Sequence, residues 1–275
     1  MQKEIVSVII PAYNSSKTIL NALSSVINQE GDFNLEVIVI DDGSTDNTAK
    51  IVLNYSEKYP KLIKLVSQKN QGVACARNQG IKHATGDFIA FLDSDDCWYP
   101  NKLQKQLYIL KNNDFFLLGG GYQGKFNSLN ANNDFFEVTY WMQLLKQYFQ
   151  PSTVIFKKEL LNKVHGFVEG RRYCEDALFF YQSCFYYRCG IIAEDVIQYG
   201  DGKHPYASGT GLGSNLWEME KGELLNFKVL LLEKKIKFWQ WGFLSILSVL
   251  KFFRRIIIKF NLLHVKLKYG INHEK

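Results

Sequence analysis

LEVIVIDDGSTDNT, residues 35–48, joins an apolar run to two carboxylates and then to a series of small polar residues. The run 35–40 is rich in β-branched residues on both faces, which is typical of a strand buried inside a parallel sheet. The polar residues that follow stop this strand, and Ser44 or Thr45 can cap the helix that comes next. The stretch therefore predicts one strand–helix unit of an α/β fold.

The same alternation of strand and helix recurs on both sides of this unit. Apolar runs and helical spacing predict strands at 5–10, 61–67 and 86–93 and helices at 16–28 and 72–83. Pro11 is expected to end the first of these strands. Strands that are apolar on both faces and alternate with helices indicate a doubly wound, mainly parallel sheet.

The rest of the chain is less regular and is predicted to end in two long helices. We expect helices at 99–112, 138–148, 157–164 and 174–187 and strands at 115–121, 152–156 and 190–199. A glycine-rich loop at 200–215 precedes the basic, apolar helices at 216–233 and 236–267. Its length favours a function rather than a simple connection.

Charge is unevenly distributed along the chain. The net charge is +6, with Lys and Arg concentrated in 221–275 and acidic residues clustered at 41–46 and 93–96. A basic flank suits an anionic partner. Because its cations are interleaved with long apolar runs, we expect that partner to be a membrane surface and not a nucleic acid.

Carboxylates collect where the predicted strands end, which is the edge at which open parallel sheets bind ligands. Asp41 and Asp42 end one strand, and FLDSDDCW places Asp93 and Asp95 at the end of another. Asp93 and Asp95 fall on the same side of the chain, and carboxylates together with phosphate are typical ligands of Mg²⁺ or Mn²⁺. Asp96 falls on the opposite side and is expected to cap the next helix or to support the site.

Five segments, in order, resemble the motifs of family-2 glycosyltransferases, which have the nucleotide-sugar-binding GT-A fold. They are VSVIIPAYN, VIVIDDGSTDNT, NQGVACARNQG, FIAFLDSDD and CED, within roughly 4–200. The resemblance implies a GT-A domain at 1–215, with a nucleotide-binding half at 1–100 and an acceptor and catalytic half at 101–215. A basic amphipathic helical tail at 216–275 would follow as a C-terminal extension.

The resemblance also implies roles for the matching positions. The nucleoside is expected to contact Pro11, Ala12, Tyr13, Asp41 or Asp42, Asn70, Gly72 and Asp93. Asp42 is the favoured contact to the base, and Asp93 would touch the ribose. Asp95 would bind a divalent Mn²⁺ or Mg²⁺ on the diphosphate. Arg77 would lie near the phosphates or hold the acidic loops together, and a structural ion pair is the alternative.

Glu175 and Asp176 begin the predicted helix at 174–187, where the helix dipole alone favours carboxylates. The resemblance implies that Asp176 is the catalytic base, with Glu175 as its support or as an acceptor contact. Lys203 and His204 in the glycine-rich loop are further candidate contacts to the phosphates. Gln150, Pro151 and Ser152 precede the predicted strand at 152–156, on the side where this family places the acceptor.

The expected activity is a metal-dependent, inverting transfer of one sugar from a nucleotide-diphosphate donor, a UDP-sugar, to a hydroxyl of a glycan or lipid-linked acceptor. Such a reaction belongs to the assembly of bacterial surface polysaccharide or lipooligosaccharide. The chain lacks the QxxRW motif of processive synthases, which favours a single addition. A sugar nucleotidyltransferase and a catalytically inactive nucleotide-sugar-binding module are the alternatives.

The segment 235–268 mixes bulky apolar side chains with Lys and Arg, which is typical of a helix at an anionic membrane surface. Packing on the domain or a homodimer interface are the alternatives. The five cysteines show no CxxC spacing, which favours free thiols in a reducing compartment. With no signal peptide or membrane-spanning run predicted, we expect a cytoplasmic protein, peripheral on the inner face of the cell membrane.

Overall fold

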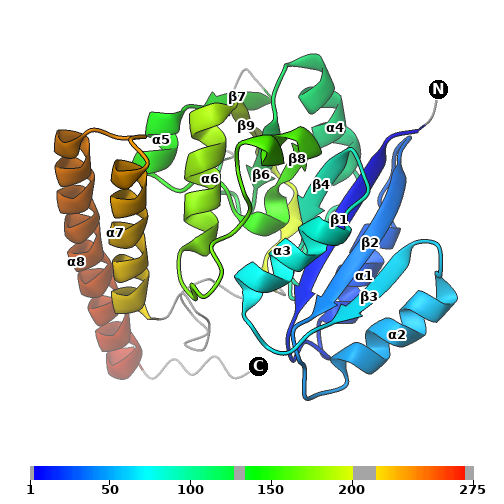
Figure 1. Cartoon of the computed structure of the whole chain (residues 1–275). Helices are drawn as coiled ribbons and strands as arrows, with labels where there is room; N and C mark the ends of the chain where they lie inside the picture. The colour runs from blue at the N-terminus through cyan, green and yellow to red at the C-terminus, as the bar shows by residue number, and fades with distance from the viewer. Residues whose placement is uncertain (1–2, 127–133, 201–214, 270–275) are drawn as a thin grey trace. The chain divides into compact units, whose positions relative to one another are not determined.

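The computed structural model describes residues 3–126, 134–200 and 215–269, with the side chains of 260–269 left aside (Figure 1). The chain divides into two compact units, Met1–Pro205 and Tyr206–Lys275. The first holds all of the sequence motifs described above, and the second is helical in its described part.

An eight-stranded sheet, as far as the chain is described, organises the first unit in the order β3-β2-β1-β4-β8-β6-β9-β7. Its strands are β1 Ile5–Ala12, β2 Asn34–Asp41, β3 Ile63–Ser67, β4 Phe88–Phe91, β6 Leu117–Gly121, β7 Phe135–Val138, β8 Ile155–Lys157 and β9 Cys189–Asp195. Strands β1 to β4 pair in parallel, as do β6 and β9. In contrast, β8 is antiparallel to β4 and β6, and β7 is antiparallel to β9. The sheet is therefore the mainly parallel, doubly wound sheet that the sequence predicts.

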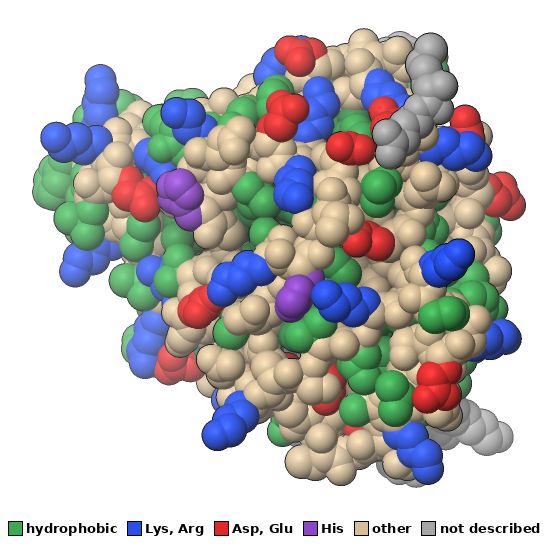
Figure 2. Space-filling view, turned by 45° about the vertical axis from the view of Figure 1, so that its right-hand side comes forward, with side chains coloured by type: hydrophobic (Ala, Val, Ile, Leu, Met, Phe, Trp, Pro, Cys, Tyr) green, Lys and Arg blue, Asp and Glu red, His purple; other side chains and the backbone are tan. Residues whose placement is uncertain are grey.

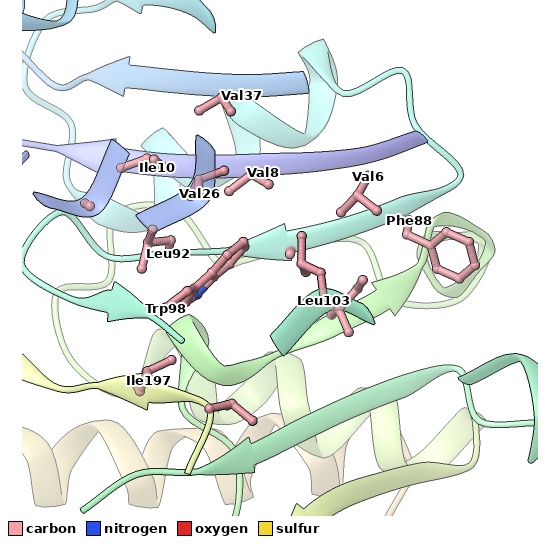
Figure 3. Close-up of a cluster of buried hydrophobic side chains, with 14 of the residues drawn as sticks. Val6, Val8, Ile10, Val26, Val37, Phe88, Leu92, Trp98, Leu103 and Ile197 are labelled. Atoms are coloured by element: carbon pink, nitrogen blue, oxygen red, sulfur yellow. The ribbon is translucent and has the colours of Figure 1, made fainter. Parts of the chain in front are cut away.

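Helices cover both faces of the sheet, because successive residues of the central strands point to opposite faces. In β1, Val8 and Ile10 belong to one core and Ile9 to the other. The first core receives α1 Ile19–Ile27, α2 Thr48–Lys58 and α4 Lys102–Asn112, and the second receives α3 Val73–His83 and α6 Glu175–Tyr186. Figure 3 shows part of the first core, in which the Trp98 ring lies beside Leu92.

The strand β1 continues through Pro11, where the sequence predicts that it ends. The pairing of β1 with β4 stops at Ile9 opposite Phe91, whereas its pairing with β2 runs on to Ala12. Ile9 accepts a hydrogen bond on the β4 side, and Pro11, two residues later, faces that same side. The missing N–H of Pro11 therefore interrupts no ladder.

Other boundaries differ from the sequence predictions in the second half of the sheet. The expected strand at 152–156 begins as a short 3₁₀ turn, Pro151–Thr153, and the expected helix at 157–164 is a 3₁₀ turn, Lys158–Asn162. The helix α5 covers only Tyr140–Leu145 of its expected range. The expected strand at 190–199 is divided into β9 and β10 Ile197–Gln198. Strands β5 Cys97–Trp98, which pairs with β10, and β7 are additions.

The helix α2 starts later than the sequence predicts. Its N-cap residue is Asn47, and the carboxylate of Asp46, rather than the hydroxyl of Ser44 or Thr45, accepts from the Thr48 backbone N–H at 2.9 Å. The polar stretch after β2 is therefore longer than a simple helix cap, and its side chains are available to neighbouring loops.

The second unit contains two helices in its described part, α7 Leu216–Leu232 and α8 Phe238–Tyr269. Trp217 packs on Phe252 with ring centroids 5.8 Å apart, and Arg255 pairs with Glu220 at 3.1 Å. These contacts join one face of α8 to α7. No helix in the described part of the chain is long and apolar enough to span a membrane.

Candidate active site

The loops that follow β1 and β2 are hydrogen-bonded to each other. The Asn14 side chain accepts from the Thr45 N–H at 2.8 Å, and the Asn14 N–H donates to Ser44 Oγ at 2.9 Å. Asn14 has a φ of 50°, in the left-handed region that Asn tolerates better than most residues. These bonds fix the end of β1 against the end of β2, and they leave Tyr13 with 51% of its surface exposed beside them.

Asp42 is buried and organises the loop after β3. Its carboxylate accepts from Gln68 Nε2 at 2.7 Å and from the backbone N–H groups of Gln71 and Gly72, each at 2.8 Å. Charge-assisted bonds of this kind are stronger than neutral ones. Asp42 thereby positions the loop that carries Asn70 and Gly72, the two residues predicted to line the nucleoside pocket.

The hydroxyl of Ser152 contacts the acidic loop after β4 at two of its residues. Ser152 Oγ accepts from the Asp93 N–H at 3.0 Å and donates to the Asp96 carboxylate at 2.5 Å. The Gly200 N–H donates to the other Asp96 oxygen at 2.6 Å. With Asp93 and Asp96 fixed in this way, Asp95 between them lies on the surface.

Asp96 supports the loop and does not cap the next helix, whose N-cap residue is Asn101. Burial raises the pKa of the Asp96 carboxyl to about 7, and the nearby charge of Asp93 acts in the same direction. The hydrogen bonds from Ser152 and Gly200 oppose that rise. A buried carboxylate without such donors would be costly, which explains why Asp96 has several.

Ser152 is itself held by buried side chains behind the loop. Trp98 Nε1 donates to the Ser152 carbonyl at 2.7 Å. Lys102, fully buried, lies with its ammonium 4.1 Å from the centre of the Trp98 ring and donates to Gln106 Oε1 at 2.7 Å. Gln106 Nε2 in turn donates to the Thr153 carbonyl at 2.8 Å. Burial lowers the pKa of Lys102 well below its ordinary value.

Arg77 joins the acidic loop to the start of α6. Its guanidinium donates to Asp93 at 2.8 Å and to Glu175 at 3.2 Å, and it lies 5.2 Å from the centre of the Phe167 ring. Only 4% of the Arg77 side chain is exposed. Arg77 therefore holds acidic segments together, which is one of the roles expected for it. Its side chain connects to Glu175, which lies 98 residues later in the sequence.

The first turn of α6 carries Glu175 and Asp176. The preceding residue, Cys174, has a φ of 55° and turns the chain sharply into the helix. Burial raises the pKa of Glu175 to about 7, with Asp176 adding to the rise and Arg77 opposing it. Burial likewise raises the pKa of Asp176, against the Arg77 charge. A carboxylate with a raised pKa is a stronger base than an exposed one once it has lost its proton.

A hollow of about 530 Å³ opens beside Asp95. Its lining comes from the loops after β1 and β2, from the acidic loop and from Gly200, and consists of Tyr13, Asn14, Ser15, Ser16, Lys17, Thr18, Asp46, Ser94, Asp95 and Gly200. The hydroxyls of Ser15 and Ser94 lie 2.7 Å apart and join the two loops. The hollow thus places the exposed carboxylate of Asp95 next to the end of β1.

Most of the predicted site residues lie on these few loops. Pro11 and Ala12 end β1 and Tyr13 follows it, Asp41 and Asp42 lie in β2 and its loop, and Asn70 and Gly72 lie on the loop tied to Asp42. Lys203 and His204 fall outside the described residues. Asn14, a polar residue directly after Tyr13 at the strand end, lies with them, as its position in the sequence predicts. The sequence does not single out Asp46, and no local signal predicts that the hydroxyl of Ser152 fixes the acidic loop.

The residues present fit a divalent cation that is shared with a phosphate. Among the described residues, no group of three or more His, Cys, Asp and Glu side chains is placed to hold a metal alone. Mg²⁺ and Mn²⁺ in nucleotide sites are commonly held by one or two carboxylates plus phosphate oxygens. The exposed Asp95, beside Asp93 and the hydroxyl-rich hollow, offers oxygen ligands of that kind.

The fold, with its carboxylates at the strand ends, is that of the GT-A glycosyltransferases. The sequence model of the family described as "Glycosyl transferase family 2" matches residues 7–194. The chain therefore belongs to glycosyl transferase family 2, and the resemblance drawn from its five sequence segments is confirmed.

Two named relatives are a glucosyltransferase and a teichoic acid biosynthesis protein. The chain is 47% identical over 120 residues to the UDP-Glc:alpha-D-GlcNAc-diphosphoundecaprenol beta-1,3-glucosyltransferase WfgD of Escherichia coli, which covers 43% of this chain and 46% of WfgD. It is 34% identical over 194 residues to the minor teichoic acid biosynthesis protein GgaA of Bacillus subtilis, covering 64% of this chain and 42% of GgaA. The chain thus spans less than half the length of either relative.

Solved structures share the same architecture. S. aureus TarS 1–349 in complex with UDP-GlcNAc is 26% identical with a TM-score of 0.65, over 84% of this chain and 67% of that chain. The mannosyltransferase PcManGT from Pyrobaculum calidifontis, in complex with GDP-Man and Mn2+, is 21% identical with a TM-score of 0.63, over 84% of this chain and 65% of that chain. These likenesses confirm the predicted fold class.

Proposed function

We propose that this chain transfers one sugar from a nucleotide-diphosphate donor to an acceptor hydroxyl, with inversion at the anomeric carbon. The observation that carries the proposal is the double contact of Arg77. Because its guanidinium binds both Asp93 and Glu175, the acidic loop and the first turn of α6 meet at one place. A donor held at the strand ends would then have its sugar near the Asp176 carboxylate.

In the proposed reaction, Asp176 removes the proton of the acceptor hydroxyl while the hydroxyl oxygen attacks the anomeric carbon. The bond from that carbon to the diphosphate breaks, and the diphosphate leaves with the electron pair. Asp95, with Asp93 beside it, would hold Mn²⁺ or Mg²⁺, which supplies positive charge to the departing diphosphate. Asp42 would keep the loop of Asn70 and Gly72 in place around the nucleoside.

The donor is proposed to be a UDP-sugar and the acceptor a glycan or lipid-linked sugar of a surface polymer. WfgD by its name uses UDP-Glc with a diphosphoundecaprenol-linked acceptor, and TarS has been crystallised with UDP-GlcNAc. The exposed ring of Tyr13 suits stacking on a base.

Thermal unfolding with a panel of nucleotide sugars, with and without Mn²⁺, tests this function. A bound donor raises the unfolding temperature by mass action. We expect the largest rise with a UDP-sugar plus Mn²⁺, followed by transfer of that sugar to a suitable acceptor. Stabilisation without any transfer or donor hydrolysis would indicate an inactive binding module, and no stabilisation by any nucleotide sugar would refute the proposal.

We further propose that α8 places the protein on an anionic membrane surface at the inner face of the cell membrane. A stripe of exposed apolar side chains runs along the helix with the alternating spacing of four and three residues, namely Trp239, Phe243, Ile246, Leu250, Phe253 and Ile257. It lies opposite the buried Leu244, Ser248 and Phe252, because these positions are half a turn away. This α8 stripe has the width and composition of an interfacial helix.

Charge decides which partner suits the α8 stripe. The helix Phe238–Tyr269 contains Lys and Arg but no Asp or Glu. A second copy of the same helix would bring cations against cations, whereas an anionic bilayer complements them. On the face seen in Figure 2, blue and red side chains are interspersed over the described residues, so that face forms no large basic patch of the kind that nucleic acids bind.

A further inference from the structure

Two lysines approach one aromatic cluster at the ends of β6 and α5. Lys125 lies 4.8 Å from the centre of the Tyr122 ring and 5.2 Å from that of Phe126. Lys146 lies 6.0 Å from the centre of the same Phe126 ring and 5.4 Å from that of Tyr148. The two ammonium groups therefore share Phe126 as a neighbour, although they are far apart from each other in sequence.

The hydrogen-bond partners of Lys125 are neutral oxygens. Its ammonium donates to the Tyr122 hydroxyl at 3.1 Å and to the Gln147 carbonyl at 3.2 Å. The nearby Asp195 carboxylate accepts instead from the Gly124 N–H at 2.8 Å. Among the described residues, no carboxylate forms an ion pair with Lys125 or Lys146, and the sequence of 127–133 contains neither Asp nor Glu.

Two ammonium groups near one another repel, and this repulsion lowers the pKa of Lys125. Burial lowers the pKa of Lys125 and the charge of Lys146 acts in the same direction, so that the pKa is about 8. Aromatic faces offset part of this cost. A bound anion close to both ammonium groups would offset the rest.

The cluster is tied to both acid-bearing segments of the candidate active site. Tyr122 packs on Tyr199 with ring centroids 5.2 Å apart, and the residue after Tyr199 donates its N–H to Asp96. On the other side, Gln147 Nε2 donates to the hydroxyl of Tyr181, on the helix that begins with Glu175. The lysines thus lie on the half of the domain in which the acceptor is expected.

We propose that Lys125 and Lys146 form a subsite that binds a phosphate group of the acceptor, an inference that rests on the proposed function. Lysine binds phosphate as a point charge and needs no fixed planar geometry. The half-buried ring of Tyr148 gives the same place an apolar face suited to a sugar ring next to the phosphate. The substrate class is accordingly a phosphorylated or phosphodiester-linked glycan, or a sugar on a lipid diphosphate.

Titration calorimetry with inorganic phosphate tests the subsite. The full chain is first saturated with UDP and Mg²⁺, so that the donor's diphosphate position is filled. We expect saturable phosphate binding that weakens by about tenfold or more in Lys125→Gln and in Lys146→Gln, because each loses a charged partner. Lys125→Arg keeps the charge and should retain binding. Lys58→Gln is the matched control, since Lys58 also lies over two aromatic rings, and no second lysine of the described residues lies over them.

Side-chain NMR of Lys125 adds a readout that a merely structural lysine would not give. Phosphate should raise the pKa of Lys125 from about 8, because an adjacent anion stabilises the charged form. Binding that equals wild type in both glutamine variants, or an unchanged Lys125 pKa, would overturn the proposal. If the wild-type chain binds UDP but not phosphate, the subsite alone is refuted, whereas failure to bind UDP refutes the proposed function.

A last arm distinguishes the source of the phosphate. Phosphatidylglycerol vesicles are sedimented with wild type and with the double variant Lys125→Gln/Lys146→Gln. Equal sedimentation is expected if the subsite serves the acceptor. A loss of sedimentation in the double variant would assign the phosphate to a lipid headgroup and overturn the acceptor assignment.

Discussion

Arg77 donates to the carboxylate of Asp93 at 2.8 Å from a side chain of which only 4% is exposed. Because Glu175 lies on the other arm of the same guanidinium, this one cation compensates the charges of two carboxylates. The candidate site is therefore built around a buried charge network, and its parts depend on one another.

Removing Arg77 should destabilise the fold strongly. Arg77→Met leaves both carboxylates without their cation, and breaking a buried pair in this way costs about 3–5 kcal/mol. Urea unfolding measures the change. Arg188→Met is the control, because Arg188 forms a pair of equal length, 2.8 Å, with Glu137 at a half-exposed position, and such surface pairs contribute about 0–1 kcal/mol. Equal losses in both variants would contradict the structural role of Arg77.

Asp95 should be essential for metal-dependent donor binding and dispensable for the fold. We expect Asp95→Ala to weaken UDP binding in Mn²⁺ by about 100-fold or more. Even the loss of a residue that only hydrogen-bonds to a metal ligand lowers metal affinity by about 10–100-fold. Because Asp95 lies on the surface, the unfolding temperature should change little. Asp32→Ala, at an exposed position paired with Lys3, should bind UDP normally. Normal Mn²⁺-dependent binding in Asp95→Ala would remove Asp95 as the metal ligand.

Asp176→Asn should separate binding from chemistry. The amide keeps the shape of the side chain but cannot accept the proton, so turnover should fall by about 10²–10⁴-fold while UDP affinity stays near wild type. In the wild type the base acts when deprotonated, so the rate rises with pH through its pKa. Since burial raises that pKa, the acid limb should lie at higher pH than for an exposed Asp. Undiminished turnover of Asp176→Asn would exclude it as the base.

Ser152→Ala should loosen the acidic loop while leaving the proposed metal ligand Asp95 in the chain. The variant loses the hydroxyl that donates to Asp96 and accepts from Asp93, and we expect about tenfold weaker Mn²⁺–UDP binding. Ser183 provides the control, because it is equally buried and its hydroxyl donates only to the Phe179 carbonyl within α6. Ser183→Ala should bind UDP as wild type does, and parallel losses would mean that Ser152 acts through stability alone.

The α8 stripe should bind anionic vesicles. The full chain is expected to sediment with phosphatidylglycerol vesicles and to be released in part by high salt, because salt screens the attraction of its cations. Ile246→Asp and Leu250→Asp place carboxylates in the stripe and should abolish sedimentation. Leu232→Asp, at an exposed apolar position of α7, should not. A shift to dimers in the wild type, with no vesicle binding, would instead assign the stripe to a second copy.

The first half of the sheet could be predicted from the sequence because its strands carry their own signal. Strands β1, β2 and β4 each contain a short run of apolar residues, and their burial on both faces follows from that composition. The edge strand β3 has the same kind of run but is only partly buried. The error at Pro11 had a cause outside the local pattern. Whether a proline ends a strand depends on where the neighbouring strand stops, and β4 stops at Phe91.

The support of the site could not be predicted in the same way. Ser152 meets Asp93 because β8 runs antiparallel to β4, with Ala90 opposite Ile155, and continuing this register places the two residues opposite each other. The direction of β8 is a property of the whole sheet and not of residues 152–157. Likewise, Arg77 meets Glu175 only after the chain has folded around both.

The antiparallel direction of β8 also affects when, during its synthesis, the chain becomes able to bind a nucleotide. Strands β1 to β4 leave the ribosome first and can pair with one another in that order, since domains begin to fold from the N-terminus. The acidic loop after β4 is complete in sequence at that stage, yet the hydroxyl that fixes it arrives only with Ser152. A nascent chain stalled before that residue would lack the bonds from Ser152 to Asp93 and Asp96, and we expect it to bind a sugar nucleotide more weakly until β8 enters the sheet.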